Sequence, residues 1–379
     1  MGRFGKKNEI NLNPLAYNIG LLGEAGIGKS TITKEICEKL AGDEGYISLD
    51  IGKEDGHKAI SGIITERVPD WETFAEIVDD IVENKDSDYP NLQIVIIDTY
   101  DQLCDIAEKE AVRLYNKKCR ESGKPTVETI NSAWGGFGKG LDKTVDLMLD
   151  KLWALKSVGV SFIIVAHVKR TDITDVMTEE QYTMLTSNTT QKYFNAIKQK
   201  LDFLGMAYID RDMVRVKTKK KDKDGNVIEK NKVSGESRVI NFRDNTYSVD
   251  SKCRFANIVD EISFDADEFI KAMQDAISAE QSHDGISVAD AKKKQAKEAK
   301  EAAKLASENS AKARAKKAEC ELEEQREDIF NQLTTAFQSS DKEHKDTAKK
   351  MMTDAGFSKF SDPDLPVTLL KEIVDYLSE

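Results

Sequence analysis

The fold of this chain is constrained most by one stretch, Gly23-Glu24-Ala25-Gly26-Ile27-Gly28-Lys29-Ser30, which matches G-x-x-x-x-G-K-[ST] at every fixed position. The apolar residues 17–22 precede it, and Ile32, Ile36 and Leu40 follow it with helical spacing. A glycine turn that merely resembled the motif would not need such flanks. The pattern therefore predicts a strand, a phosphate-binding loop (P-loop) and a helix, in that order.

The predicted loop has the chemistry of a nucleotide site for ATP and Mg²⁺. Its glycines let backbone N–H groups close around phosphates, and the following helix adds the positive end of its dipole. Lys29 is expected to reach the β- and γ-phosphates, and the Ser30 hydroxyl is expected to bind Mg²⁺. The residues predicted to bind the nucleotide are Gly23, Glu24, Ala25, Gly26, Ile27, Gly28, Lys29, Ser30 and Thr31.

The amino-acid composition limits the kinds of partner that a protein with such a site can have. The formal net charge of -12 argues against a chain that coats nucleic acid or anionic membrane along its whole surface, so DNA contacts are expected only in local basic stretches. No run of about 18 apolar residues exists, and the first ten residues lack the apolar region of a signal peptide. We expect a cytoplasmic protein without a membrane partner. The scattered cysteines suit reduced thiols.

Acidic residues follow the second predicted strand, residues 46–51. This strand runs into a glycine-flanked stretch that contains Asp50 and Glu54. In an open α/β sheet, ligands bind beyond the carboxyl ends of the strands, so both carboxylates are expected to project toward the P-loop. One of them is predicted to be the catalytic base that orients the attacking water. The alternative is an ordinary acidic loop, since aspartate and glycine are common in turns.

Two further buried strands end in polar residues. The run 92–97 closes on Asp98, the form of a Walker B element, and Asp98 is expected to hold the Mg²⁺ water shell beside Ser30. The run 160–165 leads to His167, which is placed to sense the γ-phosphate by hydrogen bonding. A structural histidine is the alternative.

Basic residues follow this histidine at once. Lys169 and Arg170 lie where a cation can act on a nucleotide in the same chain or, like an arginine finger, across a subunit boundary. Simple solvent exposure is the competing interpretation for both residues.

Two stretches are candidates for contact with single-stranded DNA. The glycine-rich residues 129–140 contain Trp134 and Phe137, which could stack on bases, with Lys139 near a phosphate. Alternatively, the aromatic side chains pack under the neighbouring helix. The second stretch, 217–232, is a predicted hairpin tip that includes Lys219, Lys220 and Lys221. Its acidic residues make a solvated, partly disordered tip an equal alternative.

The remaining periodicities complete the predicted organisation. Helices are expected over 71–84, 102–120, 141–157, 191–204 and 266–277, strands over 206–209, 213–218 and 237–242, and a polar loop over 171–190. Residues 1–16 are predicted to be a flexible arm before a core at 17–280. Beyond it we expect an Ala/Lys/Glu-rich helix or coiled-coil linker at 285–328 and a small helical module at 329–379.

Taken in order, several stretches resemble the RecA-like P-loop ATPases of bacteriophages, which include the Sak-four type of single-strand annealing proteins. These stretches are the P-loop, the acidic residues after the second strand, VIIDTYDQL, INSAWGGFGKG, FIIVAHVKR and KCRF, and together they span about residues 17–278. The resemblance implies an α/β RecA-like core with a mostly parallel central sheet, ATP and Mg²⁺, and assembly of a ring or filament homo-oligomer. It also implies a role in phage DNA recombination or replication in the bacterial host cytoplasm, with a phage single-strand-binding or recombination protein as a further partner.

Site residues carry over from this resemblance by position. Lys29 and Ser30 match the phosphate loop, Asp98 matches Walker B, Glu54 matches the catalytic acid, and His167 takes a sensor place often held by glutamine. This chain has DIGKED where RecA has a shorter D-x-E, so the choice between Asp50 and Glu54 stays open. Three functions compete: an ATPase acting on single-stranded DNA, a ring helicase or helicase loader, and a nucleotide-dependent switch or scaffold without DNA binding.

Overall fold

The computed structural model describes residues 10–53, 56–175, 178–221, 227–243, 249–282 and 288–378. The chain forms two compact units, Met1–Asn309 and Ser310–Glu379. Glu54, one of the two candidate bases, lies outside the described residues. The side chains of residues 216–232, which include the three hairpin lysines, are also outside the description, although the strands that carry them are within it.

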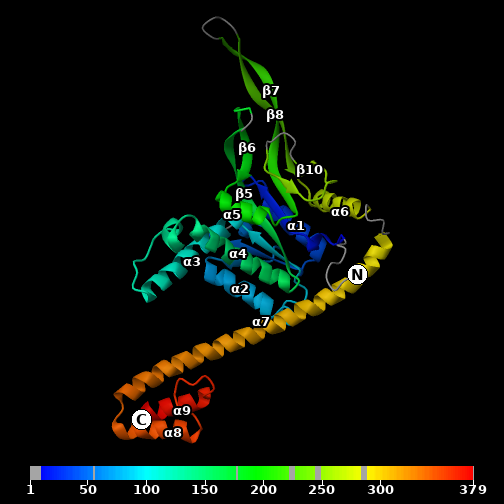
Figure 1. Cartoon of the computed structure of the whole chain (residues 1–379). Helices are drawn as coiled ribbons and strands as arrows, with labels where there is room; N and C mark the ends of the chain where they lie inside the picture. Colours follow the sequence, from blue (N-terminus) through cyan, green and yellow to red (C-terminus); the bar gives the residue numbers. More distant parts are fainter. Residues whose placement is uncertain are drawn as a thin grey trace. The chain divides into compact units, whose positions relative to one another are not determined.

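A ten-stranded sheet formed by the described residues organises the first unit (Figure 1). Its strands are β1 (Ile19–Gly23), β2 (Tyr46–Ile51), β3 (Thr65–Val68), β4 (Ile94–Asp98), β5 (Ser161–Thr174), β6 (Gln181–Ser187), β7 (Phe203–Lys221), β8 (Val227–Asn241), β9 (Lys252–Cys253) and β10 (Glu261–Ser263). The main order is β10-β8-β7-β1-β5-β4-β2-β3, and all pairs from β7 to β3 are parallel. This arrangement confirms the predicted α/β fold with a mostly parallel central sheet.

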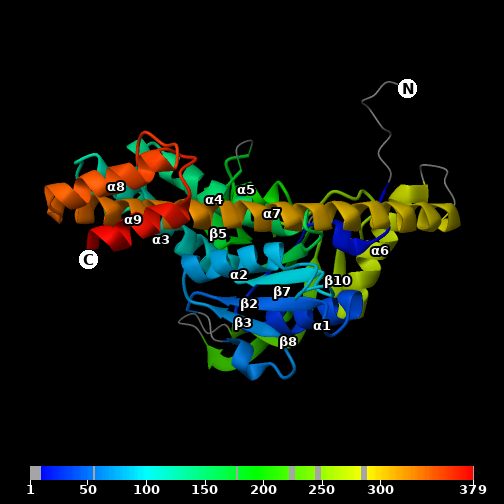
Figure 2. The same ribbon diagram turned by 90° about the horizontal axis from the view of Figure 1, so that it is seen from below.

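Helices cover both faces of this sheet (Figures 1 and 2). They are α1 (Lys29–Ala41), α2 (Trp71–Glu83), α3 (Tyr100–Glu121), α4 (Lys139–Ser157), α5 (Gln191–Lys198) and α6 (Ala266–Ser282). Helices α1 and α6 pack together on one face, and α2 to α5 cover the other. Such a sheet is buried on both sides, which explains its nearly continuous apolar strands. In β4, for example, every residue from Ile94 to Asp98 is buried.

Strand β1 lies in the middle of the sheet and places the P-loop at its carboxyl edge. Gly23, the last residue of β1, pairs with His167 of β5 on one side and Ala207 of β7 on the other. Both neighbouring strands continue well past this edge, β5 to Thr174 and β7 to Lys221. Each then returns as an antiparallel partner, β6 or β8, so two hairpins extend beyond the edge that carries the P-loop.

The prediction of a polar loop at 171–190 is wrong. Most of this stretch is the β5–β6 hairpin, whose ladder runs from Val168 opposite Ser187 to Thr174 opposite Gln181. Threonine and aromatic residues favour strands, but the acidic residues Asp172, Glu179 and Glu180 among them make the stretch resemble a loop in sequence. Likewise, the separately predicted strands 206–209 and 213–218 form one strand, β7, which continues through a bulge at Asp212.

The second unit has its own apolar core. It contains the C-terminal part of α7 (Val288–Ser339), together with α8 (Lys342–Asp354) and α9 (Val367–Ser378). The buried residues that form this core are Ile329, Leu333, Ala348, Met352, Leu365, Leu370, Ile373 and Leu377. Across the described parts of the chain, no helix is both long and apolar enough to cross a membrane.

Candidate nucleotide-binding site

The P-loop connects β1 to α1 through a backbone that requires glycine. Gly26 and Gly28 have φ angles of +74° and +107°, a region that residues with a side chain rarely adopt. Gly28 is also the N-cap of α1, and no side chain caps the helix there. The first amide groups of an α-helix have no acceptor within the helix, so this end of α1 presents N–H donors suited to a phosphate.

The ammonium group of Lys29 folds back into the loop. Its Nζ donates to the carbonyl oxygens of Gly23 at 3.1 Å and Glu24 at 3.0 Å, and the residue is buried. Carbonyl oxygens accept these hydrogen bonds without cancelling the charge of the lysine. The loop therefore offers a positive charge and helix amides together, which is a combination that fits nucleotide phosphates.

Ser30 of α1 and Asp98 of β4 are in direct contact. The Ser30 hydroxyl donates to Asp98 Oδ2 at 2.5 Å, although the two residues are 68 positions apart. Among the described residues there is no cluster of three or more His, Cys, Asp or Glu side chains that could hold a metal. Mg²⁺ does not need one, because it is commonly bound through one or two protein oxygens plus substrate phosphates and water. The hydroxyl and the carboxylate thus fit the predicted Mg²⁺ of a bound nucleotide.

His57, which sequence reasoning missed, also contacts this carboxylate. It lies on the 3-10 helix η2 (Gly56–Ala59) after β2, and its Nε2 is 2.9 Å from Asp98 Oδ2. Its Nδ1 is 2.6 Å from the Thr65 hydroxyl at the start of β3. The available signal was a single histidine just after the acidic stretch, which by itself does not distinguish a site residue from a core residue.

Asp50 lies next to Asp98 in the sheet but is held by an arginine. The two aspartates are register partners on β2 and β4. Asp50 Oδ2 is 2.9 Å from Arg67 Nη1, and the same guanidinium donates to the Gly52 carbonyl at 2.5 Å. The other oxygen, Asp50 Oδ1, is buried and has no hydrogen-bond partner in the described part of the chain. One oxygen of Asp50 is therefore occupied by Arg67, and the other is enclosed within the protein.

His167 lies beside the first residue of the P-loop, since it pairs with Gly23. Its backbone N–H donates to Asp101 Oδ2 at 2.8 Å, and its Nδ1 is 3.3 Å from the same oxygen. Asp101 belongs to the first turn of α3, directly after the β4 strand that ends at Asp98. The ring is partly exposed. A role for His167 as a γ-phosphate sensor stays a prediction.

The basic pair beyond His167 lies on the β5–β6 hairpin. Lys169 and Arg170 are both exposed and stand opposite Thr186 and Leu185 of β6. Because side chains alternate along a strand, they point to opposite faces, with Lys169 on the face of His167. Of the two, therefore, only Lys169 points to the same face of the hairpin as His167.

The two aromatic residues of the glycine-rich stretch 129–140 have different surroundings. Trp134 packs against α3, where its indole N–H donates to the Ala111 carbonyl at 3.0 Å and its ring contacts Tyr115. Of the two interpretations left open for these aromatics, Trp134 follows the packing alternative, although its side chain is only partly buried. Phe137 is fully exposed, and Lys139 is an exposed residue at the start of α4.

Two residues from late in the sequence of the first unit, Arg238 and Phe264, lie against the P-loop. Arg238 of β8 donates from Nη1 to the Ile27 carbonyl at 3.2 Å. A Cβ atom on Gly28 would lie 3.4 Å from the Phe264 ring, which follows β10. Both residues are more than 200 positions from the loop, and no local pattern connects them to it. They form the side of the loop that faces β8 and β10.

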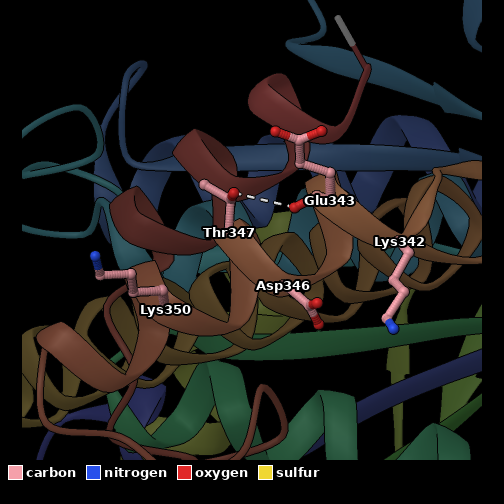
Figure 3. A pocket seen from close by; sticks show the side chains of 5 residues that line it. All are labelled: Lys342, Glu343, Asp346, Thr347 and Lys350. Atoms are coloured by element: carbon pink, nitrogen blue, oxygen red, sulfur yellow. Dashed lines mark hydrogen bonds between the residues drawn. The ribbon is translucent and has the colours of Figure 1, made fainter.

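A shallow hollow on α8 offers no comparable site. Figure 3 shows its lining residues, which all lie on one helix: Lys342, Glu343, Asp346, Thr347 and Lys350. The Thr347 hydroxyl donates to the backbone carbonyl of Glu343, which is an ordinary bond within a helix. None of the five residues is buried, and the formal charges of the two lysines and the two acidic residues cancel.

Comparison with known proteins identifies the family. No curated protein matches the chain. One similar solved structure is described as a prototypical ATPase from the type III secretion system of pathogenic bacteria; it is 15% identical, with a TM-score of 0.30, and the match covers 52% of this chain and 51% of that one. Residues 15–255, more than half of the chain, match the family model described as an AAA domain. The chain therefore belongs to the AAA domain family.

Proposed function

We propose that this protein is a Mg²⁺-dependent ATPase that acts on single-stranded DNA in recombination or replication. The observation that carries the nucleotide part is the 2.5 Å contact between Ser30 and Asp98 beside Lys29 in the P-loop. Membership of the AAA domain family supports nucleotide-dependent activity in general. A bound Mg²⁺ would offset charge on the phosphates.

The residues of this chain would divide the work as follows. Lys29 and the first amides of α1 would bind the phosphates, while Ser30 and Asp98 would hold the metal. Because Asp50 is already paired with Arg67, we propose Glu54 as the base that orients the attacking water. His167, on β5, would sense the γ-phosphate. Lys169 would act on the nucleotide of its own chain or, like Arg170, on the nucleotide of a neighbouring subunit.

Two hairpins near the P-loop and one exposed aromatic residue support the proposal that the protein acts on DNA. Both hairpins extend beyond the sheet edge that carries the P-loop, and the β7–β8 hairpin carries Arg211, Arg215 and, toward its tip, the lysines 219–221. Phe137 adds a fully exposed aromatic ring that suits base stacking. Few phosphates would be neutralised per subunit, so binding should depend on salt with a modest slope. A ring or filament of copies of this chain would multiply these contacts.

The test is an ATPase assay with and without single-stranded DNA, with Lys29→Ala as the inactive control. Stimulation by single strands supports the proposal, and strand displacement would instead indicate a ring helicase. Turnover per subunit should rise with protein concentration if neighbours complete the site. Hydrolysis indifferent to DNA, together with no binding to labelled single strands at about 50 mM salt, refutes the DNA part and favours a nucleotide-dependent switch or scaffold.

A further inference from the structure

The ring of His57 links the carboxylate at the end of β4 to the edge strand β3. Its Nε2 lies 2.9 Å from Asp98 Oδ2, and its Nδ1 lies 2.6 Å from Thr65 Oγ1. The side chains of His57 and Asp98 are only 5% and 7% exposed. Asp98 Oδ2 therefore has two partners inside the protein, the Ser30 hydroxyl and the His57 ring.

The chemistry of the partners sets the direction of these bonds. An ionised carboxylate can only accept hydrogen bonds, so Nε2 of His57 carries the hydrogen that faces Asp98. In a neutral ring Nδ1 is then an acceptor, and the Thr65 hydroxyl donates to it. The Asp98 carboxylate thereby selects the ring form with the hydrogen on Nε2, and the Thr65 hydroxyl, which can donate or accept, bonds to Nδ1 and holds the ring in that orientation. Partners of this kind orient a metal-binding group, and their loss commonly lowers metal affinity or activity by about 10–100-fold.

We propose that His57 is a positioning residue that orients Asp98 for Mg²⁺, with Thr65 holding the ring in place. This inference rests on the proposed ATPase function. The connection also joins η2 to the Asp98 carboxylate at the end of β4. A purely structural histidine would instead stabilise the fold without changing the response to Mg²⁺.

The experiment measures binding of a fluorescent ATP analogue to the full chain while Mg²⁺ is titrated. His57→Leu removes the N–H donor, and we expect it to raise the Mg²⁺ concentration at half-maximal gain in binding by about tenfold or more. Binding in EDTA should stay within about twofold of wild type, because the P-loop is unchanged. His57→Gln keeps an amide N–H near the position of Nε2 and should recover most of the shift. Thr65→Val should give a smaller shift in the same direction.

A matched control is His344→Leu, since His344 lies on α8 in the second unit and its side chain is 41% exposed. It should leave the Mg²⁺ titration unchanged. The inference is overturned if His57→Leu titrates within about twofold of wild type, or if His57→Gln is as defective as His57→Leu. Should His57→Leu not fold, as judged by thermal unfolding, Thr65→Val decides, and an unshifted titration refutes the inference. Failure of the proposed function is separate, because wild type itself would then show no Mg²⁺-dependent gain in nucleotide binding.

Discussion

Replacing Asp50 with asparagine separates the two candidate bases. The structure pairs the buried Asp50 carboxylate with Arg67 at 2.9 Å, so Asp50→Asn should weaken the fold more than it slows the chemistry. We expect hydrolysis to stay within about tenfold of wild type, because one oxygen of this carboxylate is already bonded to Arg67 and is not free to orient a water. The opposite pattern would identify Asp50 as the catalytic residue.

The expected loss of stability follows from the contacts. A hydrogen bond to a charged group contributes about 1.5–3 kcal/mol. The Arg67 side chain is 43% exposed, so solvent screening reduces that value, and Arg67 keeps its bond to the Gly52 carbonyl. We therefore expect Asp50→Asn to lower the free energy of unfolding by about 1 kcal/mol, or Tm by about 1–2 °C for a unit of about 300 residues.

Denaturant unfolding and steady-state ATPase rates on the same samples provide the assay. Arg67→Met should cost more, about 2 kcal/mol, since it leaves a buried carboxylate without its cation. Combining it with Asp50→Asn should cost less than the two separate losses together. Asp79→Asn, which breaks a more exposed ion pair with Lys151, is the control and should change stability by less than about 0.5 kcal/mol. Unchanged stability with a rate reduced about 10²–10⁴-fold in Asp50→Asn would refute the reasoning.

Other expected outcomes concern the P-loop, the base and DNA. Lys29→Ala should abolish hydrolysis and weaken binding of a fluorescent ATP analogue, and unchanged turnover would contradict the nucleotide site itself. Glu54→Gln should still bind ATP but hydrolyse it about 10²–10⁴-fold more slowly in single-turnover assays, and a normal rate would exclude it as the base. Arg238→Gln removes the guanidinium bonded to the Ile27 carbonyl and should weaken nucleotide binding by about threefold; equal affinity would show that this contact is incidental. Replacing the lysines 219–221 with alanine should lower single-strand affinity in fluorescence anisotropy with basal ATPase intact, and undiminished affinity would move the DNA contact elsewhere.

The sequence predicted the parts of the site that depend on local pattern. A P-loop is a contiguous motif, and an apolar run that ends in aspartate, as at Asp98, signals a buried strand with a polar end. By contrast, His57 reaches Asp98 only because a short helix folds over the end of β2, and Arg238 reaches Ile27 only because β8 pairs with β7 beside β1. Those contacts depend on how strands that are distant in sequence pair and on where the chain folds back. No local spacing of residues in a single sequence reveals either of these.

The β5–β6 hairpin was missed for a different reason. Beyond the core, the half-buried residues Ile173, Tyr182 and Met184 alternate with exposed polar residues, but each strand contains too few of them for the pattern to stand out from a loop. The packing of Trp134 against α3 was likewise undecided from composition, because neighbouring glycines suit an exposed loop and a tight turn equally. Its indole bond to Ala111 depends on where α3 lies.

The position of β1 between two strands that outgrow the sheet has a mechanical consequence. The amide of Glu24, the second residue of the P-loop, donates to the Ala207 carbonyl at 3.4 Å, so the loop touches β7 where that strand leaves the sheet. From Ala207 to the end of β7 at Lys221, a strand rises about 45 Å. With a lever of that length, a tilt of about 5° at its base would carry the far end about 4 Å. A small displacement of the P-loop around a nucleotide would thus become a larger displacement at the tip of the β7–β8 hairpin. The hairpin is long enough to lie along several nucleotides of a single strand.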